Sequence, residues 1–186
     1  MTKTRSKLFS FIKTLICLIV LAAVAFPVFW VTGTEMIHYT SNAKFCSSCH
    51  VMQPMTDAFY LDAHGGRGRT GVRLECTDCH LPRGNAFKHL AHKTKSGLHD
   101  IWANFTYDLD AIDWEKKRDR REEFTLNASC INCHTELEQG AKANPKAFVA
   151  HKPYFLGETT KTCIECHKNV GHKDLGFHLS KHKGTQ

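Results

Sequence analysis

Hydrophobic and charged positions divide the chain into an apolar N-terminal run and a longer remainder of mixed character. No charged residue occurs from Thr14 to Thr34, a run of 21 residues, and four basic residues precede it: Lys3, Arg5, Lys7 and Lys13. At about 1.5 Å per residue, a helix of this length crosses a hydrocarbon core about 30 Å thick. Because positive flanks stay in the cytoplasm, we expect a cytoplasmic segment at 1–13, a single membrane-spanning anchor at 14–34 and a periplasmic domain at 35–186.

A cleaved signal peptide is the alternative interpretation of this run, since Ala23-Val24-Ala25 resembles a small-residue cleavage site. The apolar run continues past that site to Val31, whereas the hydrophobic part of a signal peptide usually has about 7–15 residues. The pattern therefore favours an uncleaved anchor in a bacterial inner membrane. Cys17 lies within this anchor and is expected to be chemically inert.

The remainder predicts a mainly α-helical domain with many loops and little or no sheet. Its clearest amphipathic stretch has apolar residues at roughly helical spacing: Phe87, Leu90, Ala91, Leu98, Ile101, Trp102 and Phe105. The segment from Asp108 to Glu123 is rich in both charge signs. We expect it to form a solvated helix that connects two halves of the domain.

Eight of the nine cysteines fall into four C-x-x-C-H patterns, the attachment motif of c-type haem. Two cysteines one helical turn apart can each form a thioether with the same porphyrin, and the adjacent histidine then reaches the iron. The expected attachment cysteines are Cys46, Cys49, Cys76, Cys79, Cys130, Cys133, Cys163 and Cys166. The expected motif histidines are His50, His80, His134 and His167. The sequence thus predicts four covalently bound c-type haems.

Three other interpretations of the paired cysteines fit less well. Zinc knuckles need no histidine directly after each pair, and thioredoxin-like redox pairs belong to a βαβ pattern that this sequence lacks. Structural disulfides do not require regular triplets. The formal net charge of +7 is largely offset by haem propionates and its residues are dispersed, so nucleic acid is not expected as a partner.

The motifs repeat as two pairs, at 46–105 and 130–172, which predicts two duplicated dihaem units. Within each pair one histidine, His64 or His151, lies 16 residues before the histidine of the second motif. This repeated spacing predicts that both are distal ligands of low-spin irons, with His172 as a third distal ligand. The spacing does not say which distal histidine serves which haem. His178 and His182 lie in a polar tail and are expected to be solvated.

The domain is small for four haems. The 152 residues after Thr34 leave 38 for each haem (152/4), so the haems are expected to form much of the core. Haems so crowded lie nearly edge to edge, which is the structural basis of an electron wire.

The first motif differs from the others in the residues that follow it, His50-Val51-Met52. A methionine thioether is a haem ligand that raises the reduction potential, and Met52 could replace His50 on the first iron. The alternative is that Met52 fills a gap beside the porphyrin, as methionine often does.

The N-terminal anchor, the four motifs and the Cys46-x-x-Cys49-His50-x-Met52 segment resemble the NapC/NirT family of membrane-anchored tetrahaem quinol dehydrogenases. The resemblance covers nearly the whole chain and includes Ala63-His64-Gly65-Gly66. Arg83 departs from it, because many members have a histidine at this position, and it leaves the branch of the family open.

In the branch that serves cytochrome c nitrite reductase, the resemblance implies that Met52, and not His50, ligates the first iron. It also implies that Lys93 and Asp100 belong to a quinol pocket beside the first haem. The residues themselves agree with this, because the two lie seven apart, two turns along one side of a helix. A carboxylate there can accept a proton from a hydroquinone. The alternative is an ordinary surface helix with a solvated Lys93 and Asp100.

The resemblance therefore implies an oxidoreductase subunit of anaerobic respiration. It would oxidise membrane quinol, with menaquinol as the favoured substrate. It would pass the electrons through four haems to a periplasmic reductase, for example of nitrite or nitrate. A homo-oligomer is left open. A passive membrane-tethered shuttle without its own quinol site is the second hypothesis. A multihaem reductase is the third, and it is disfavoured because the C-x-x-C-K motif of ammonia-forming nitrite reductases does not occur.

Overall fold

The computed structural model describes residues 2–183, apart from the side chains of residues 2–6 and 8. The chain divides into two compact units, Met1–Ser41 and Asn42–Gln186. The first unit is helix α1, Thr2–Tyr39. Its segment Phe9–Tyr39 contains an 18-residue window with a mean hydropathy of 2.6 and is, within the described residues, the one helix long and apolar enough to cross a membrane.

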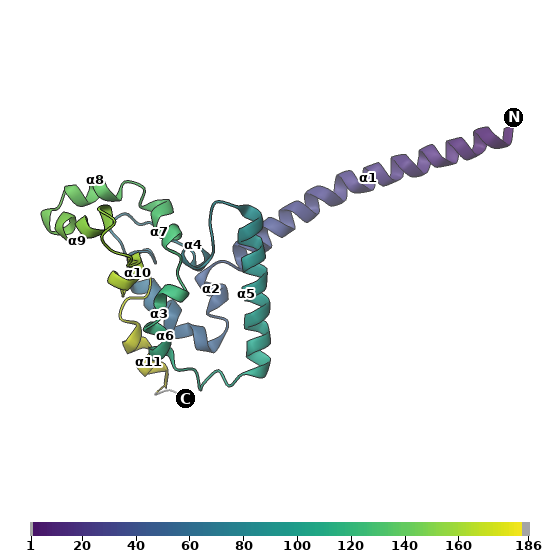
Figure 1. Cartoon of the computed structure of the whole chain (residues 1–186). Coiled ribbons are helices and arrows are strands. Elements are labelled where there is room, and N and C mark those ends of the chain that lie inside the picture. The colour runs from purple at the N-terminus through teal and green to yellow at the C-terminus, as the bar shows by residue number, and fades with distance from the viewer. Residues whose placement is uncertain (1, 184–186) are drawn as a thin grey trace. The chain divides into compact units, whose positions relative to one another are not determined.

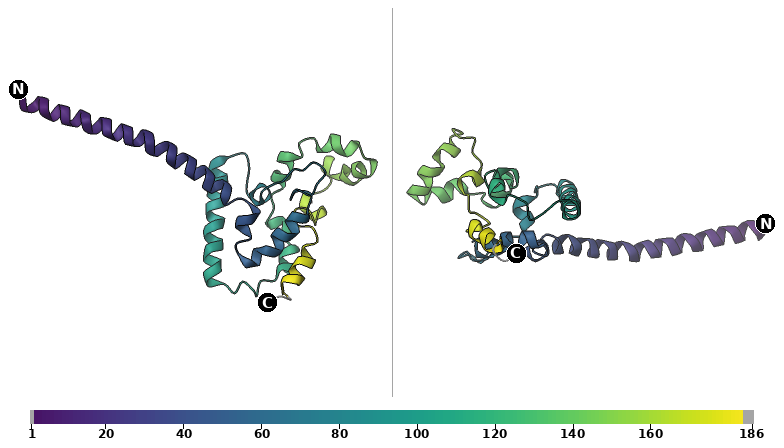
Figure 2. Two further views of the ribbon diagram at one scale, coloured as in Figure 1. Left: turned by 180° about the vertical axis from the view of Figure 1, so that it is seen from behind. Right: turned by 90° about the horizontal axis from the view of Figure 1, so that it is seen from below.

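The second unit consists of short helices joined by loops (Figures 1 and 2). Its helices are α2 Ala43–Cys46, η1 His50–Met52, α3 Gln53–Leu61, α4 Cys76–His80, α5 Ala86–Thr106, α6 Trp114–Arg118, η2 Arg121–Glu123, α7 Asn127–Cys133, α8 Leu137–Lys142, α9 Pro145–Phe155, α10 Cys163–Cys166 and α11 Leu175–Lys183. The described residues contain no strand, and their one β-bridge joins Gly65 to Arg73. The mainly helical fold class predicted from the sequence is confirmed.

Side-chain caps explain where several of these helices begin. The Oδ1 atom of Asn85 accepts a hydrogen bond from the Lys88 amide at 2.9 Å at the start of α5. Asn42 caps α2 in the same way, accepting from the Phe45 amide at 2.9 Å. Such caps satisfy amides that have no partner inside the helix. The 21-residue α5 runs unbroken along one side of the unit in both figures.

The second unit has a small protein core. Its buried hydrophobic residues are Ala43, Met55, Ala58, Phe59, Leu81, Ala141, Ile164 and Leu179. Three of the eight are alanines, and among the described residues no large side chain falls below 2 % exposure. Close-packed side chains normally supply most of a domain's stability. A core of this size fits a fold that is organised around prosthetic groups.

Helix α11 packs on α3 and corrects the expectation that the C-terminal histidines are solvated. His178 is buried, with 7 % exposure, and Leu179 beside it has 5 %. The Nε2 atom of His182 lies 3.1 Å from the Oδ2 atom of Asp57, so this half-buried side chain forms an ion pair when it is protonated. Leu175, His178 and His182 recur at helical spacing, and this puts them on one face of a segment that looks polar as a whole.

The charged segment from Asp108 to Glu123 is not the single connecting helix that was expected. The Oδ1 atom of Asp113 accepts from the Lys116 amide at 3.0 Å and starts the short helix α6. A turn and the 3-10 helix η2 follow it. Leu109, Ile112 and Trp114 are partly buried, so this segment is also less solvated than its charge indicates.

The α11–α3 contact predicts a stability effect. Replacing Leu179 by Ala removes a side chain that is 5 % exposed and should lower the free energy of unfolding by about 2–4 kcal/mol. Thermal denaturation of the purified holoprotein measures the change. Phe177→Ala on the same helix is the matched control, because Phe177 is 67 % exposed and its loss should have little effect. Equal losses for both variants would contradict the packing of α11 described above.

Candidate haem centres

Three of the four C-x-x-C-H motifs share one local geometry. Helices α4, α7 and α10 each carry two motif cysteines one turn apart. In α10, the Thr162–Glu165 capping box starts the helix at the first motif cysteine, and the Glu75–Asp78 box does the same in α4. Both sulfurs of each pair therefore lie on one side of a helix, as attachment to one porphyrin requires. None of the eight motif cysteines forms a disulfide.

Three motif histidines each face one of the isolated histidines. The ring centres of His64 and His134 are 6.2 Å apart, those of His80 and His172 are 6.2 Å apart, and those of His151 and His167 are 5.8 Å apart. Two imidazoles that bind opposite sides of one metal ion through bonds of about 2 Å have their centres about 6 Å apart. Each pair therefore has the spacing of two axial ligands on one haem iron.

The pairing crosses the two predicted dihaem units. His64, from the first half of the chain, faces His134 of the third motif, and His172, near the C-terminus, faces His80 of the second motif. Only His151 faces a motif histidine of its own half, His167. The structure thus indicates which distal histidine faces which motif histidine, a question that the spacing left open. The role of each residue as an iron ligand stays a prediction.

Hydrogen bonds at Nδ1 orient the rings of these histidines. The Nδ1 atoms of His80, His151 and His172 lie 2.6, 2.8 and 2.9 Å from the backbone oxygens of Phe124, Ala147 and Met55 respectively. A carbonyl oxygen only accepts, so each Nδ1 carries the proton and Nε2 is left to bind a metal. The Nδ1 atom of His64 lies 3.0 Å from the Oδ1 atom of Asp62, which orients this ring in the same way.

The pair His80–His172 borders an apolar cavity of about 150 Å³ that is also lined by Met55, Phe124, Ile164 and Leu175. Part of the His80 side chain is accessible from the surface, but protein atoms surround the ring on most sides. This partial burial lowers the pKa of His80. Burial also lowers the pKa of His172, and the neighbouring His80 adds to this effect. Both shifts favour the neutral imidazole, which is the form that binds a metal. The residues present therefore fit a haem.

Contacts between motif cysteines set the order of the four centres. The thiols of Cys46 and Cys76 form a hydrogen bond that lowers the pKa of Cys46 and raises that of Cys76. Cys79 interacts electrostatically with Cys130 and Cys133, and burial raises its pKa. Cys130 and Cys163 are again hydrogen-bonded. The motifs therefore follow one another in space in the order in which they occur in the sequence.

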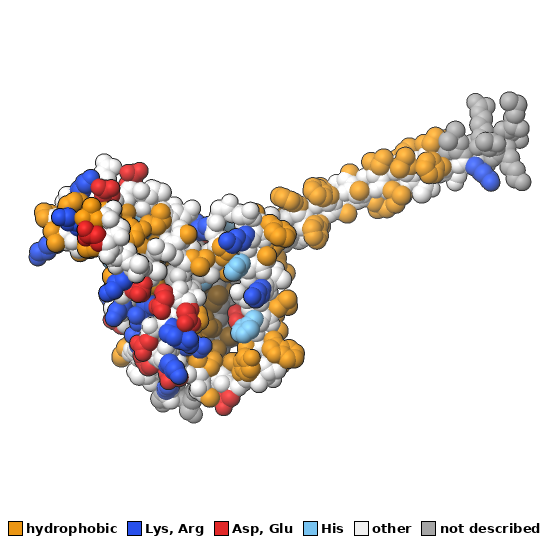
Figure 3. All heavy atoms as spheres, viewed as in Figure 1, with side chains coloured by type: hydrophobic (Ala, Val, Ile, Leu, Met, Phe, Trp, Pro, Cys, Tyr) orange, Lys and Arg blue, Asp and Glu red, His pale blue; other side chains and the backbone are white. Residues whose placement is uncertain are grey.

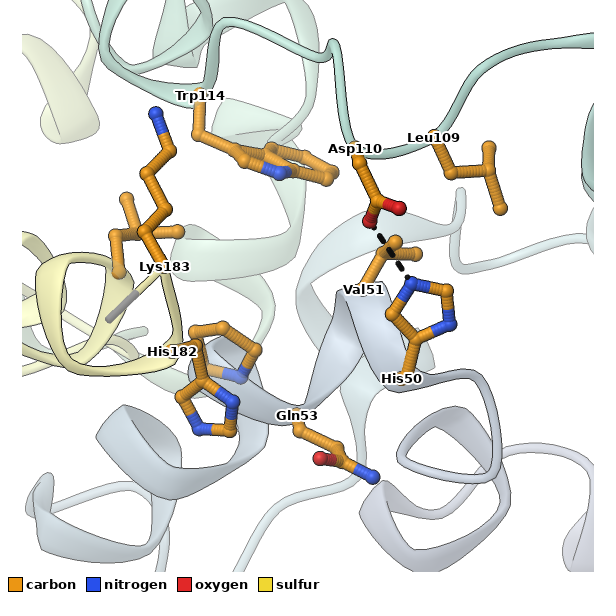
Figure 4. Close-up of a pocket in the computed structure, with 10 residues that line it drawn as sticks. His50, Val51, Gln53, Leu109, Asp110, Trp114, His182 and Lys183 are labelled. Carbon is orange, nitrogen blue, oxygen red and sulfur yellow. Dashed lines mark hydrogen bonds and ion pairs between the residues drawn. The ribbon is translucent and has the colours of Figure 1, made fainter. Parts of the chain in front are cut away.

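The first motif is built differently from the other three. Among the described residues, no other ring lies opposite His50 as in the three pairs. Its Nε2 atom lies 3.1 Å from the Oδ1 atom of Asp110 across a cavity of about 310 Å³ (Figure 4). Met52 ends the 3-10 helix η1 and is partly buried. This arrangement occupies the metal-binding nitrogen of His50 and leaves Met52 as the predicted ligand.

Helix α5 brings Lys93 and Asp100 to the first motif, because both interact electrostatically with the thiol of Cys46. Burial lowers the pKa of Lys93, while Glu75 and Cys46 act in the opposite direction. Asp100 remains exposed, with its Oδ1 atom 3.4 Å from the Nδ1 atom of His99. Lys93 and Asp100 thus lie within electrostatic range of the first motif, and their part in a quinol pocket stays a prediction.

Sequence reasoning missed the residues that orient the ligands. Asp62 follows α3 and bonds His64 two residues later, and Asp110 lies in the segment that was expected to be a solvated helix. His178 was missed as well, and neither of its ring nitrogens has a partner among the described residues. A haem propionate is a group that could accept a hydrogen bond from it. Arg83 forms an ion pair with Asp78 of the second motif.

Three facing imidazole pairs, four C-x-x-C-H motifs and a small protein core define a multihaem c-type cytochrome. The chain belongs to the NapC/NirT cytochrome c family, whose model for the N-terminal region matches residues 9–176. Family membership supports haem as the cofactor and electron transport in anaerobic respiration as the general role. The N-terminal apolar helix fits anchoring in the inner membrane.

Relatives are found among several electron-transfer proteins. The tetraheme c-type cytochrome CymA of Shewanella oneidensis is 31 % identical over 172 residues, which cover 86 % of this chain and 90 % of CymA. The denitrification system component NirT of Stutzerimonas stutzeri is 31 % identical, with coverage of 83 % and 80 %. The nitrite reductase subunit NrfH of Nitratidesulfovibrio vulgaris is 29 % identical, with coverage of 72 % and 69 %.

A solved structure has a similar fold. A chain of the cytochrome c nitrite reductase NrfHA complex bound to the HQNO inhibitor superposes with a TM-score of 0.56 at 28 % identity. The match covers 84 % of this chain and 90 % of that chain.

The pairing predicts the effect of removing each distal histidine. His64→Ala, His151→Ala and His172→Ala should each convert one low-spin haem to high-spin, because one imidazole of a facing pair is lost. Electron paramagnetic resonance counts the low-spin centres. His92→Ala on α5 is the control, since His92 is exposed and belongs to none of the three pairs. An unchanged low-spin count in any of the three variants would remove that histidine from the ligand set.

Proposed function

We propose that this protein oxidises membrane quinol at its first haem and passes the electrons through the other three haems to a periplasmic reductase. The observation that carries the proposal is the asymmetry of the four centres. Three have facing imidazole pairs, whereas the first has Met52, a histidine bonded to Asp110, and the Lys93–Asp100 pair beside Cys46. Three centres have a facing imidazole pair, and the first centre at the end of the row has none. This difference gives the electron path a defined entry point.

The relatives support both ends of this path. NrfH is named as a subunit of a nitrite reductase and NirT as a component of a denitrification system, so a reductase is a suitable electron acceptor. The solved NrfHA complex holds the inhibitor HQNO. We propose that HQNO binds this chain in the same segment as quinol, between the first haem and α5.

The side chains of the first centre suit the chemistry of quinol oxidation, in which two electrons and two protons leave the molecule. Bound haem supplies a one-electron acceptor. Lys93 can donate a hydrogen bond to one quinol oxygen and so orient the ring. Asp100 is exposed and within the electrostatic reach of Cys46, which suits it to accept a proton and release it to water.

The anchor sets the orientation of the path. The basic residues before Thr14 support a cytoplasmic N-terminus, and we propose that the second unit lies in the periplasm. A quinol dissolved in the bilayer and a reductase in the periplasm then meet the same domain. A passive shuttle would need the anchor but not the Lys93–Asp100 pair at the first motif, and this pair favours the quinol dehydrogenase.

Removal of the proposed base predicts a large kinetic effect. Asp100→Asn keeps the size of the side chain and should lower quinol-driven haem reduction by about 10²-fold or more, the usual contribution of a general base. Stopped-flow absorbance with a menaquinol analogue measures this rate. Reduction by dithionite should stay normal, because the row of haems is intact. Lys93→Ala should also slow quinol oxidation, and Lys95→Ala, an exposed neighbour on the same helix, is its control. Parent rates in Asp100→Asn and Lys93→Ala would place the quinol site elsewhere.

Loss of the methionine ligand predicts a change at one haem. Met52→Leu preserves the hydrophobic volume and removes the sulfur, so it should alter the spectrum and lower the potential of the first haem alone. Potentiometric titration separates this haem from the other three. Met36→Leu is the control, because Met36 is an exposed residue of α1 and lines none of the haem centres described above. If both variants behave like the parent protein, Met52 has only a packing role.

A further inference from the structure

Helix α5 exposes an apolar stripe that the rest of the fold does not cover. Phe87 and Phe105 are 83 % and 81 % exposed, and four further large side chains between them are also exposed: Leu90, Leu98, Ile101 and Trp102. At 3.6 residues per turn, the six lie within an arc of about 120°. Figure 3 shows hydrophobic side chains along α5 with Lys and His side chains among them.

The stripe faces away from the haem-bearing side of α5. Lys93 and Asp100 interact with Cys46 and lie on the other half of the helix. His89, on that half as well, has its Nδ1 atom 3.0 Å from the backbone oxygen of Pro82 in the loop that leads into α5. The stripe therefore does not line the proposed quinol site and needs a different partner.

The charges along the stripe match a phospholipid surface. α5 contains three lysines and one aspartate, a formal charge of +2 with neutral histidines (3 − 1). Lys88 and Lys95 lie along one edge of the stripe, together with His92 and His99. A basic edge beside a face of Phe, Leu and Trp is typical of helices that lie in the membrane interface. Protein interfaces, by contrast, are depleted in lysine.

Chain length keeps the second unit close to the bilayer. α1 ends at Tyr39 and the second unit begins at Asn42, so Thr40 and Ser41 alone join them. Two residues and their peptide bonds reach at most about 10 Å. A domain on so short a linker stays near the surface of any membrane that α1 spans. Its exposed apolar face is therefore always within reach of lipid.

We propose that α5 is an interfacial helix whose apolar stripe is inserted into the headgroup–acyl boundary of the bilayer. The contact holds the opposite half of the helix, with Lys93 and Asp100, at the level where a lipid-soluble quinol leaves the membrane. The proposal rests on the proposed membrane anchorage, and it does not depend on quinol oxidation.

Photo-cross-linking of the full-length holoprotein tests this contact. p-Benzoylphenylalanine replaces Phe105 in the stripe or, as the matched control, Ser96, which is exposed on the opposite half of α5. The protein is reconstituted into liposomes of phosphatidylcholine with phosphatidylglycerol and irradiated, and mass spectrometry identifies the adducts. We expect a phospholipid adduct at position 105 that exceeds the adduct at position 96 severalfold.

The other cross-linking results would overturn the proposal. A protein band of twice the mass from position 105 would assign the stripe to a second copy of the chain. No adduct at position 105, or equal lipid adducts at both positions, would leave α5 without a specific lipid contact. A protein that oxidises quinol but forms no lipid adduct would retain the proposed function and lose this inference. A lipid adduct together with parent rates in Asp100→Asn and Lys93→Ala would retain this inference and contradict the proposed quinol site.

Discussion

The facing of two imidazoles at the distance of a shared metal ion is the constraint on which the second unit depends. His64 and His134 are 70 residues apart in sequence (134 − 64), and His80 and His172 are 92 apart (172 − 80), yet each pair has ring centres 6.2 Å apart. The buried hydrophobic residues are few and include three alanines, so side-chain packing contributes little to holding these segments together. Under the predicted ligation, coordination of one iron by two distant segments would supply the long-range connections that a larger core otherwise provides. This explains how helices as short as α2 and α10 keep defined positions.

The same constraint makes the domain directional. A haem iron with two imidazole ligands has no open position and can only exchange electrons, and three of the four centres fit that description. The first centre differs because Asp110 occupies the Nε2 atom of His50. The order of the cysteine contacts, Cys46 to Cys76, Cys79 to Cys130 and Cys130 to Cys163, then makes the sequence order of the motifs the spatial order of the path. In the proposed function, electrons that enter at the first haem would follow one continuous route through every centre.

Local patterns made much of this predictable. The cysteine spacing identifies the four attachment sites, and the repeated interval of 16 residues selects His64 and His151 from thirteen histidines. Which ring faces which was not predictable, because the crossed pairing depends on tertiary contacts between the two halves. The orienting partners were missed for the same reason, since Asp110 meets His50 across 60 residues. The burial of His178 was missed because α11 is short and charged, and its apolar face is defined only by its contact with α3.

Helix α5 combines two requirements that a quinol dehydrogenase must meet at one place. Quinol is soluble in lipid, whereas its protons must leave into water, so the site of oxidation has to lie at the boundary between the two. One half of α5 carries an exposed apolar stripe with a basic edge, and the other half carries Lys93 and Asp100 beside Cys46. The two faces are separated by rotation about the helix axis. A helix of 21 residues is about 31 Å long, so each face extends along the whole helix. The amphipathic pattern of Phe87–Phe105 therefore reflects more than solvent exposure. Under the proposed function, the polar half of the helix also supplies the side chains that act on quinol at the first haem.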